Sequence, residues 1–465
     1  MSGLKAIFNE DEIERLYADE KAYCLGSPRD RPGAPQRPLV VRGEGAYFWD
    51  ARGKKYVDFT AQVFNVNVGM GNRKVIEAMK RQLDALPYTN FRYLSLPKIE
   101  LAKRLAKIMP GDLCQTFFSS GGGDANDSAI KIAQMYKATP KLIGLWDAYH
   151  GATYATVSIG GSASMRSVAG LSIFEEFKHI PAPYCYRCAF GRKYPECGLQ
   201  CVQFLEYTIA KEQPVAAFMA EPVSCYAGMA VPPKEYWPMV RRICNEKGIL
   251  LILDEVMTGF ARTGKMFACE HWDIVPDIMT LAKGITAGYA PLGATVVTKR
   301  LADYIAERGF PHYYTYGGHA LACATALAVI DYYTKENVVE KAAKMGNYMT
   351  KELHAMEERH HVIGDIRALG FMIGVELVAN RQTKEPLEPK NLTKEQIGDP
   401  KYNPIAYLQE LALDKGLALA LAPGTCIIRL LPTLVITKEQ VDEGLKILED
   451  VIAAVEKRFN LPKKQ

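Results

Sequence analysis

Short apolar runs alternate with amphipathic stretches through most of the chain, from Lys74 onward. The runs that have the length of a strand read CQTFFSS, KLIGLW, AAFMAEPV, ILLILDEV, DIMTLAKG and GATVVTK. Amphipathic helices fit the stretches between them. Strands that alternate with helices form mostly parallel sheets that helices cover on both faces. The pattern therefore predicts an α/β fold.

The two ends of the chain have a different character. A helix and a Pro/Gly/Arg-rich segment are expected before residue 38, and LVVRGEGAYFWDARGKKYVDFT predicts a hairpin around the turn Asp50-Ala51-Arg52-Gly53. From about Asn337 a long charged helix is followed by a strand pattern, a polar loop and a last strand and helix. We expect an N-terminal segment (1–70) that contributes to a small domain, a large domain (71–336) and a C-terminal small α+β domain (337–465).

Composition and charge narrow the class of protein. The chain has 465 residues, 48% of them hydrophobic and 23% charged, which allows a large buried core. The net charge of +5 is small and no long block of one sign occurs, so neither nucleic acid nor a membrane surface is indicated as a partner. No apolar run has the length of a membrane-spanning helix, and the first residues lack a signal-peptide core. We therefore expect a cytoplasmic protein whose 11 cysteines are reduced.

Ligands of such sheets bind beyond the carboxyl ends of the strands, so the residues that follow the apolar runs are candidates for chemistry. After CQTFFSS come Gly121, Gly122 and Gly123, and a helix is expected to begin around Asp124. Glycines allow close approach of a ligand, and a helix N-terminus offers free N–H groups, so this turn suits a phosphate. A flexible turn between strand and helix is the alternative, because a glycine run alone is a weak signal.

Two further strand ends carry charged residues. Asp254 follows ILLIL, where a carboxylate either caps a helix, forms an ion pair or faces a cationic ligand. Lys283 ends DIMTLA, where a partly desolvated amine can act as a nucleophile, although a lone strand-end lysine is more often on the surface. A phosphate turn, a carboxylate and a lysine at neighbouring strand ends together match pyridoxal 5′-phosphate.

The motifs LDEVMTGFARTG, AKGITAGYAPLGA and TYGGHALACA give the chain a strong resemblance to class III pyridoxal-phosphate aminotransferases of fold type I. The resemblance runs from GAYFWDARGKKYVDFT to IIRLLPTLVITKEQVD, which is nearly the whole chain. It implies a transaminase (aminotransferase) in which the large domain binds the cofactor. It also implies a homodimer with shared active sites, and it leaves open whether dimers pair into tetramers.

The resemblance also assigns roles to individual residues. Lys283 would form the Schiff base and carry the proton, and Asp254 would pair with the pyridinium nitrogen. The other cofactor-binding residues that it implies are Gly122 and Gly123 at the phosphate, Tyr149 and Val256 on the two faces of the ring, Glu221 near the phenolic side, and Thr315 at the phosphate of the neighbouring subunit. Outside this resemblance, Tyr149 would be interpreted as a core aromatic residue and Thr315 as a turn residue.

The chain departs from the family pattern at the phosphate turn and in the substrate region. The family's turn usually contains serines and a glutamate, whereas this chain has three glycines and Asp124. Ornithine, acetylornithine and 4-aminobutyrate members carry a glutamate after the Glu-Pro motif, where this chain has Tyr226 in EPVSCYAG. Arg429 is left without that glutamate and is predicted to hold an anionic group of the substrate. Phe64 stands where ω-transaminases place an aromatic residue that shapes the substrate pocket.

These features favour amino transfer from an ω-amino acid or amine, of the taurine, β-alanine or 4-aminobutyrate type, to pyruvate or 2-oxoglutarate. The segment PYCYRCAFGRKYPECGLQC resembles some ω-amino-acid and taurine transaminases. The sequence leaves open a lyase that acts on a 2-aminoethyl compound, or a racemase or epimerase, on the same fold. A non-catalytic oligomeric protein is disfavoured because Lys283 and Asp254 are intact.

The same segment contains a cysteine pattern outside the expected catalytic residues. Cys185, Cys188, Cys197 and Cys201 have the spacing C-x2-C-x8-C-x3-C, which could hold a structural zinc ion. Reduced cysteines packed beside aromatic residues are the alternative. No metal is expected in the catalytic site itself.

Overall fold

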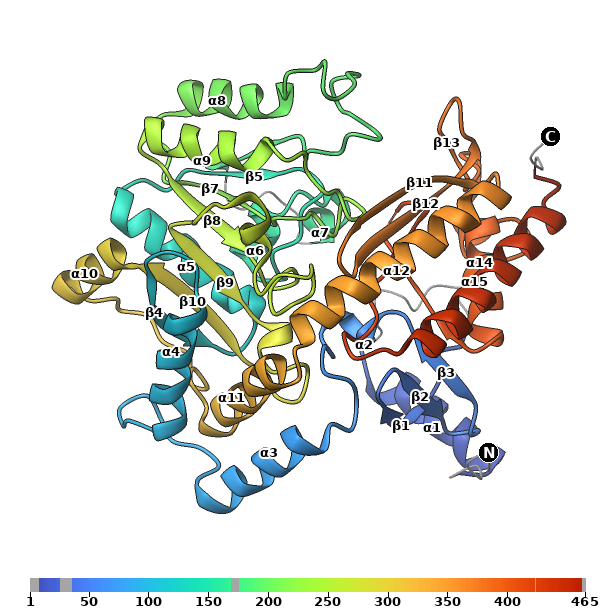
Figure 1. Cartoon of the computed structure of the whole chain (residues 1–465), viewed down its shortest axis with the longest axis horizontal. Helices are drawn as coiled ribbons and strands as arrows, with labels where there is room; N and C mark the ends of the chain where they lie inside the picture. The colour runs from blue at the N-terminus through green and yellow to red at the C-terminus, as the bar shows by residue number, and fades with distance from the viewer. Residues whose placement is uncertain (1–7, 26–35, 169–174, 423, 462–465) are drawn as a thin grey trace.

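The structure is a computed structural model that describes residues 8–25, 36–168, 175–422 and 424–461 (Figure 1). Its α-helices are α1 (Glu10–Tyr23), α2 (Ala61–Phe64), α3 (Arg73–Ala85), α4 (Leu96–Ile108), α5 (Gly122–Lys137), α6 (Tyr154–Ile159), α7 (Ala163–Val168), α8 (Gln200–Glu212), α9 (Tyr236–Lys247), α10 (Lys299–Arg308), α11 (Ala320–Lys335), α12 (Val338–Arg359), α13 (Lys394–Ile397), α14 (Pro404–Asp414) and α15 (Lys438–Arg458). Two short 3-10 helices are η1 (Ala268–Trp272) and η2 (Lys283–Ile285).

Three sheets are formed by the strands of the described residues. The strands are β1 (Val40–Glu44), β2 (Tyr47–Asp50), β3 (Lys55–Asp58), β4 (Leu113–Ser119), β5 (Leu142–Leu145), β6 (Phe177–Ile180), β7 (Ala217–Ala220), β8 (Leu250–Asp254), β9 (Ile278–Leu281), β10 (Gly293–Thr298), β11 (Ile363–Leu369), β12 (Met372–Asn380), β13 (Glu385–Pro386), β14 (Leu417–Ala418), β15 (Ala420–Leu421) and β16 (Ile427–Leu430).

The central sheet has the strand order β4-β10-β9-β8-β7-β5-β6. Strands β6, β5, β7, β8 and β9 run parallel to one another, and β10 runs antiparallel to both of its neighbours, β9 and β4. The predicted α/β fold with a mostly parallel sheet is therefore confirmed. The parallel strands also end at one edge of the sheet, which brings the residues that follow them together.

Both faces of the central sheet are buried. Along β8, Leu250 and Ile252 pack into one apolar layer and Leu251 and Leu253 into the other, as the alternation of side chains in a strand requires. Helices α5, α6 and α10 contribute to the first layer, and α8, α9, α11 and α12 contribute to the second. This double burial explains why these strands are apolar throughout their length.

The structure differs from the sequence prediction in three local features. Strand β6 was not predicted, because its sequence FKHI contains two polar residues among four. The predicted hairpin around Asp50–Gly53 is formed by β2 and β3, and β1 adds a further antiparallel strand. Helix α5 begins at Gly122, two residues before the predicted start, so that two glycines form its first turn.

The last part of the chain forms an antiparallel sheet in the order β11-β12-β16-β15, and α12, α14 and α15 lie beside it on the right of Figure 1. The N-terminal strands form a sheet of order β1-β2-β3-β14, in which β14 comes from the C-terminal part and pairs parallel with β3. The domain boundaries at residues 70 and 336 stay a prediction. Within the described residues, no helix has the length and apolar character needed to cross a membrane.

Candidate active site

Asp254, the last residue of β8, holds a buried carboxylate in a set of directed hydrogen bonds. Its Oδ2 accepts from Asn126 Nδ2 at 2.8 Å and lies 2.8 Å from His150 Nδ1, and its Oδ1 accepts from the Val256 N–H at 3.0 Å. The side chain of Asp254 is 4% exposed. Three donors therefore converge on this carboxylate and fix its orientation at the strand end.

His150 is completely buried against this carboxylate. Burial alone would lower the pKa of His150, but the hydrogen bond to Asp254 and its negative charge raise the pKa above the ordinary value. Its other ring nitrogen, Nε2, is buried without a hydrogen-bond partner in the described part of the chain. Asn126 is fixed in turn by Thr280 Oγ1, which donates to its side-chain oxygen at 2.6 Å. The Asp254 carboxylate is therefore oriented by side chains from α5, β9 and the segment after β5.

Lys283 follows β9, the neighbour of β8 in the sheet, and it begins η2. Its φ of 46° lies in the left-handed region, which a residue with a side chain adopts at a cost of about 1–3 kcal/mol. The side chain is half-buried, and among the described residues its Nζ has no hydrogen bond and no ion pair. The Lys283 amine is therefore partly shielded from solvent but is not bound to a carboxylate of the described residues. It can react with a ligand without first breaking an ion pair.

The glycine turn lies between β4 and α5 and leaves backbone N–H groups free. Gly122 and Gly123 are the first two residues of α5, so their N–H groups have no acceptor within the helix. A Cβ on Gly122 would lie 2.9 Å from Val256 Cγ1, and a Cβ on Gly123 would lie 3.6 Å from the Gly151 Cα. The turn is therefore packed closely against the segment after β8, and the positive end of the α5 dipole faces this edge of the sheet.

Glu221, just after β7, is a buried carboxyl beside the Asp254 group. Its two oxygens accept from the Tyr149 N–H at 3.3 Å and the Cys225 N–H at 3.1 Å. Burial raises the pKa of Glu221 to about 7, and the negative charge of Asp254 adds to this, while His150 and the two N–H groups oppose it. Glu221 can therefore gain or lose a proton near neutral pH.

Tyr149 is 38% exposed and stacks on Tyr226, with ring centroids 5.6 Å apart and planes 15° from parallel. Burial raises the pKa of Tyr149, and the neighbouring Tyr226 and Asp254 add to the shift. The ring thus stays a neutral phenol at physiological pH, with part of its surface open to a planar ligand.

Arg429, on β16, is a buried cation that has no carboxylate partner among the residues that the structure describes. Its Nη2 donates to the Leu421 carbonyl at 2.8 Å, its Nη1 lies 3.4 Å from Cys225 Sγ, and its guanidinium lies 4.8 Å from the centroid of the Phe64 ring. Its Nε is buried without a partner, and no carboxylate of the described residues lies within 4.0 Å. A buried guanidinium is costly unless an anion pairs with it, which makes Arg429 suited to an anionic ligand.

Most residues that the sequence singled out lie in one neighbourhood. Cys225 links two of them, because its N–H donates to Glu221 and its Sγ lies 3.4 Å from Arg429 Nη1. Burial raises the pKa of its thiol, and the charges of Arg429, Glu221 and Lys283 also act on it. Asp254 and Glu221 are linked in the same way through His150. Thr315 lies apart from this group on an exposed loop, where its carbonyl accepts from Tyr88 Oη at 2.8 Å.

Sequence reasoning assigned no role to His150, Asn126 and Cys225. Each lies next to a residue or motif that was singled out: Tyr149, the glycine turn and Tyr226. This adjacency could have identified them from the sequence, because the residue next to a ligand-contacting side chain often supports that side chain from behind.

The cysteine segment lies outside this group. Cys185, Cys188, Cys197 and Cys201 line a cavity of about 20 Å³ together with aromatic side chains that include Tyr194. All four are free thiols. In the described ranges, no group of three or more His, Cys, Asp or Glu side chains is arranged to hold a metal ion.

Comparison with known sequences gives one family and relatives of several activities. Residues 31–452 match the class III aminotransferases. The leucine/methionine racemase of Thermococcus litoralis is 38% identical and is matched over 90% of this chain and 91% of its own. The putrescine–pyruvate aminotransferase of Pseudomonas aeruginosa is 35% identical over 90% and 91%. The (R)-1-hydroxy-2-aminoethylphosphonate ammonia-lyase of Vibrio splendidus is 32% identical over 91% and 88%.

Solved structures with the same fold include two transaminases. The taurine:2-oxoglutarate aminotransferase of Bifidobacterium kashiwanohense, solved in complex with PLP and glutamate, is similar with a TM-score of 0.89 and 32% identity, over 99% of this chain and 100% of that one. An (S)-enantioselective omega-transaminase of Thermomicrobium roseum is similar with a TM-score of 0.85 and 37% identity, over 97% and 98%.

Proposed function

The chain belongs to the class III aminotransferases, which use pyridoxal 5′-phosphate, and from this premise we propose its reaction. It transfers an amino group from an ω-amino acid or amine, of the taurine, β-alanine or 4-aminobutyrate type, to pyruvate or 2-oxoglutarate. The observation that supports this proposal is geometric: Glu221 accepts from the Cys225 N–H, and Arg429 Nη1 lies 3.4 Å from Cys225 Sγ. Lys283 and Asp254 stand at the ends of the adjacent strands β9 and β8. We propose that these groups form one site.

The residues at the strand ends fit the cofactor. Gly122 and Gly123 offer free N–H groups and a helix dipole to the phosphate, and a Cβ at Gly122 would crowd Val256. The buried carboxylate of Asp254 suits a protonated ring nitrogen. Tyr149 and Val256 are proposed to cover the two faces of the ring, and the titratable Glu221 to lie at the phenolic side.

Lys283 is the proposed catalytic residue. Its Nζ would hold the cofactor covalently in the resting enzyme and, with an amine donor bound, would take the proton from the donor carbon and deliver it during amino transfer. When bound, the cofactor supplies an electron sink for the electron pair that this proton leaves behind. No carboxylate among the described residues forms an ion pair with Nζ, which leaves this group free to move within the site.

The substrate region supports an anionic substrate group. Arg429 is proposed to bind the carboxylate or sulfonate, and the Phe64 ring on its face keeps the guanidinium in place. Tyr226 stands where some family members have a switching glutamate, and it stacks on Tyr149 instead of pairing with Arg429. Arg429 is therefore ready for an anion without a prior rearrangement.

The leucine/methionine racemase among the relatives supports a second candidate. In a racemase the amino group stays on the substrate: Lys283 would take the proton from one face of the carbon, and a second donor would have to supply a proton from the other face. A lyase acting on a 2-aminoethyl compound is a further alternative, supported by the ammonia-lyase relative. All three activities use the same lysine, so the fate of the amino group distinguishes them.

A half-reaction with single amines tests the proposal. The cofactor-loaded enzyme is mixed with taurine, β-alanine, 4-aminobutyrate, ornithine, L-alanine, L-leucine or phosphoethanolamine in the absence of an oxo acid, and the cofactor absorbance is followed. We expect at least one ω-amino acid to convert the cofactor stoichiometrically and ornithine to fail. Pyruvate or 2-oxoglutarate should then restore the starting spectrum.

Two results would contradict amino transfer. Loss of optical activity of L-leucine over many turnovers, with the cofactor spectrum unchanged, would identify a racemase. Release of ammonia or phosphate over many turnovers without an oxo acid would identify a lyase. If the Arg429→Leu enzyme reacts with every anionic amine as the wild type does, the proposed role of Arg429 is wrong.

The chain is further proposed to act as a homodimer. Large apolar side chains are exposed together on two loops and the ends of α3 and α4: Leu83, Leu86, Phe91, Tyr93, Leu94, Leu96, Ile99, Tyr313 and Tyr316. The two loops are in contact, because the rings of Phe91 and Tyr313 stack with centroids 4.6 Å apart. An exposed apolar surface of this kind is typical of an interface, and Thr315 lies on it, where it can reach the phosphate of a second copy.

Leu94→Arg should dissociate the dimer, because a buried charge at the centre of an apolar interface is unpaired. Sedimentation analysis should show a monomer, and the cofactor should dissociate more readily because Thr315 of the second copy is lost. The matched control is Leu25→Arg, since Leu25 is fully exposed and is not one of the side chains of this surface. A Leu94→Arg protein that sediments like the control would contradict the proposed interface.

A further inference from the structure

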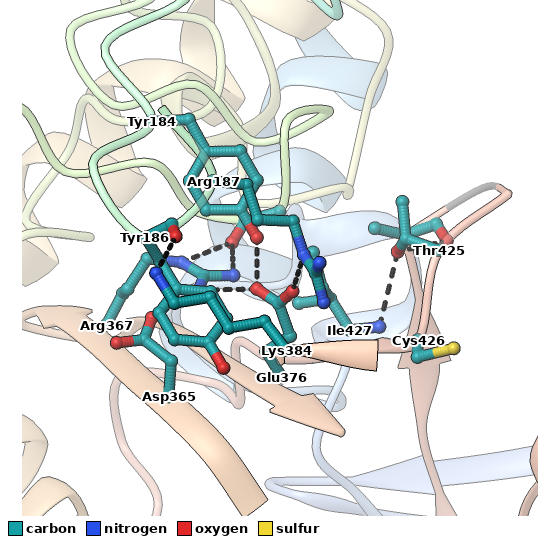
Figure 2. Close-up of polar contacts among 12 residues, drawn as sticks. Tyr184, Tyr186, Arg187, Asp365, Arg367, Glu376, Lys384, Thr425, Cys426 and Ile427 are labelled. Carbon is teal, nitrogen blue, oxygen red and sulfur yellow. Dashed lines mark hydrogen bonds and ion pairs between the residues drawn. The ribbon is translucent and has the colours of Figure 1, made fainter. Parts of the chain in front are cut away.

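Figure 2 shows a largely buried cluster of charged side chains that includes none of the residues assigned above to the cofactor or the substrate. At its centre is Glu376, on β12, whose side chain is 2% exposed. The carboxylate accepts hydrogen bonds from Tyr184 Oη and Arg187 Nε, and from Arg367 Nη1 at 2.8 Å. Two cations and a phenol thus hold one buried carboxylate, an arrangement that fixes all four side chains relative to one another.

Arg367, on β11, also reaches out of this cluster. Its Nε and Nη2 donate to the Gly228 carbonyl at 3.1 and 2.8 Å, while Nη1 binds Glu376 and Asp365. Its guanidinium lies 4.7 Å from the centroid of the Tyr184 ring. All three nitrogens of its guanidinium are therefore used in one planar arrangement, which a lysine cannot reproduce.

The Gly228 carbonyl, which Arg367 binds, belongs to the turn 224–230, and this turn also carries Cys225 and Tyr226. Ser224 and Ala230 close this turn by paired backbone hydrogen bonds of 3.2 and 3.0 Å, and Gly228 N–H donates to the Cys225 carbonyl at 3.1 Å. Cys225 contacts Arg429, and Tyr226 stacks on Tyr149. The position of the turn therefore determines where the side chains that contact Arg429 and Tyr149 lie.

Gly228 leaves the turn little freedom on its other side. It has a φ of 82°, and a Cβ there would lie 2.2 Å from Ile427 Cδ1, so the turn is packed directly on β16. Strand β12 pairs Glu376 with Ile427 and Gly374 with Arg429. Glu376, which binds Arg367, therefore lies on the strand next to the one that carries Arg429. The residue opposite Arg429 is Gly374, two residues before Glu376.

From these contacts we infer that Arg367 and Glu376 are positioning residues for the anion-binding part of the substrate site. They hold the turn 224–230 so that Cys225 and Tyr226 keep Arg429 and Tyr149 in place for an anionic group. The inference rests on the proposed function, in which Arg429 binds that group. Neither Arg367 nor Glu376 is expected to touch the substrate or the cofactor.

The test compares Arg367→Lys with a matched arginine elsewhere. Arg241 donates to Asp277 at 2.8 Å with side chains 15% and 9% exposed, which is close to the burial of the Arg367–Glu376 pair, but it lies at the opposite end of β8 and β9. Arg241→Lys should therefore lower thermal stability to a similar extent without changing the substrate region. Glu376→Gln is a second variant, which removes the charge and keeps the shape.

Two measurements on the cofactor-loaded enzymes separate positioning from stability. Hydrogen exchange followed by mass spectrometry should show faster exchange in residues 224–230 for Arg367→Lys and Glu376→Gln but not for Arg241→Lys. Titration calorimetry with glutarate, a non-reacting dicarboxylate, should show an affinity about tenfold weaker in the same two variants, which is about 1.4 kcal/mol. In half-reactions, amines with an anionic group should need higher concentrations, while an alkylamine without one should react as in the wild type.

Unchanged exchange in the turn, or an equal effect on anionic and non-anionic amines, would overturn the inference. The proposed function fails separately. If Arg429→Leu leaves glutarate binding and anionic half-reactions unchanged, Arg429 is not the anion site, whatever the Arg367 variants do to the turn. If Arg429→Leu weakens both and Arg367→Lys weakens neither, amino transfer stands and the positioning role is wrong.

Discussion

Replacing Lys283 with alanine is expected to lower the rate of amino transfer by at least about 10²–10⁴-fold, the contribution of proton transfer alone. The covalent attachment of the cofactor is lost as well, so its resting spectrum should become that of the free aldehyde. Borohydride reduction followed by peptide mass spectrometry should place the reduced cofactor on Lys283 in the wild type. In Lys283→Ala no lysine should be labelled.

The fold should tolerate this substitution, because Nζ makes no hydrogen bond in the described structure and the backbone strain at φ 46° is not increased by a shorter side chain. Lys265→Ala is the matched control, since Lys265 is an exposed lysine that follows the Asp254 strand. The control should keep the wild-type rate and label. A Lys283→Ala enzyme that still cycles at a rate close to this control would show that another group carries the proton.

Asp254→Asn should lower the rate by about 10²–10³-fold, the usual effect of removing one preorganised electrostatic partner of a reacting group. The carboxylate accepts hydrogen bonds on both oxygens, from Asn126 and His150 on one and from the Val256 N–H on the other. An amide must place its NH₂ group against one of these donors. The variant therefore loses both the charge at the ring nitrogen and the fixed orientation of the side chain.

The pH dependence of this variant provides a second measurement. His150 owes its raised pKa to Asp254, which outweighs the opposing effect of burial. A histidine whose pKa is raised by folding stabilises the folded protein. This stabilisation is fully present below the pKa of the unfolded state and is lost as the pH rises through the pKa of the folded state. The stability difference between wild type and Asp254→Asn should therefore be larger at acidic than at alkaline pH.

Asp277→Asn is the control for Asp254→Asn. Asp277 is also a buried aspartate with several donors, Arg241, Arg300 and the Leu251 N–H, but it lies at the other end of the same strands. This control should lose stability and keep its rate per folded molecule. Equal rates in the two variants would mean that the charge of Asp254 has no role in the reaction.

The apolar runs predicted the central sheet and the edge at which its parallel strands end. A strand that is buried on both faces is apolar at nearly every position, which makes it easy to recognise in a sequence. Lys283 and Asp254 interrupt such runs, so their places at strand ends could be inferred without a structure. Strand β6 was missed because a short edge strand buries only part of its surface and keeps polar residues. The start of α5 was placed too late because glycine has a low helix propensity, although its small size fits the turn.

The contacts between distant segments could not be predicted in this way. His150 meets Asp254, and Arg367 meets Gly228, across more than one hundred residues of chain. Alternation along β11 and β12 predicts which side chains share a face, but not which loop will pack against that face. The hydrophobic pattern of one segment does not say which other segment packs against it. The roles of His150 and Arg367 could therefore be inferred only from the folded structure.

The pairing of β14 with β3 has a consequence for the order in which the protein folds. Val57 in the N-terminal sheet is paired with Leu417, so this sheet is completed only when nearly all of the chain has been synthesised. Contacts of such long sequence separation form late, because the entropy of closing the loop between them must be overcome first. Until β14 is available, β3 therefore has an unpaired edge, and unpaired edges make an incompletely folded chain prone to aggregation.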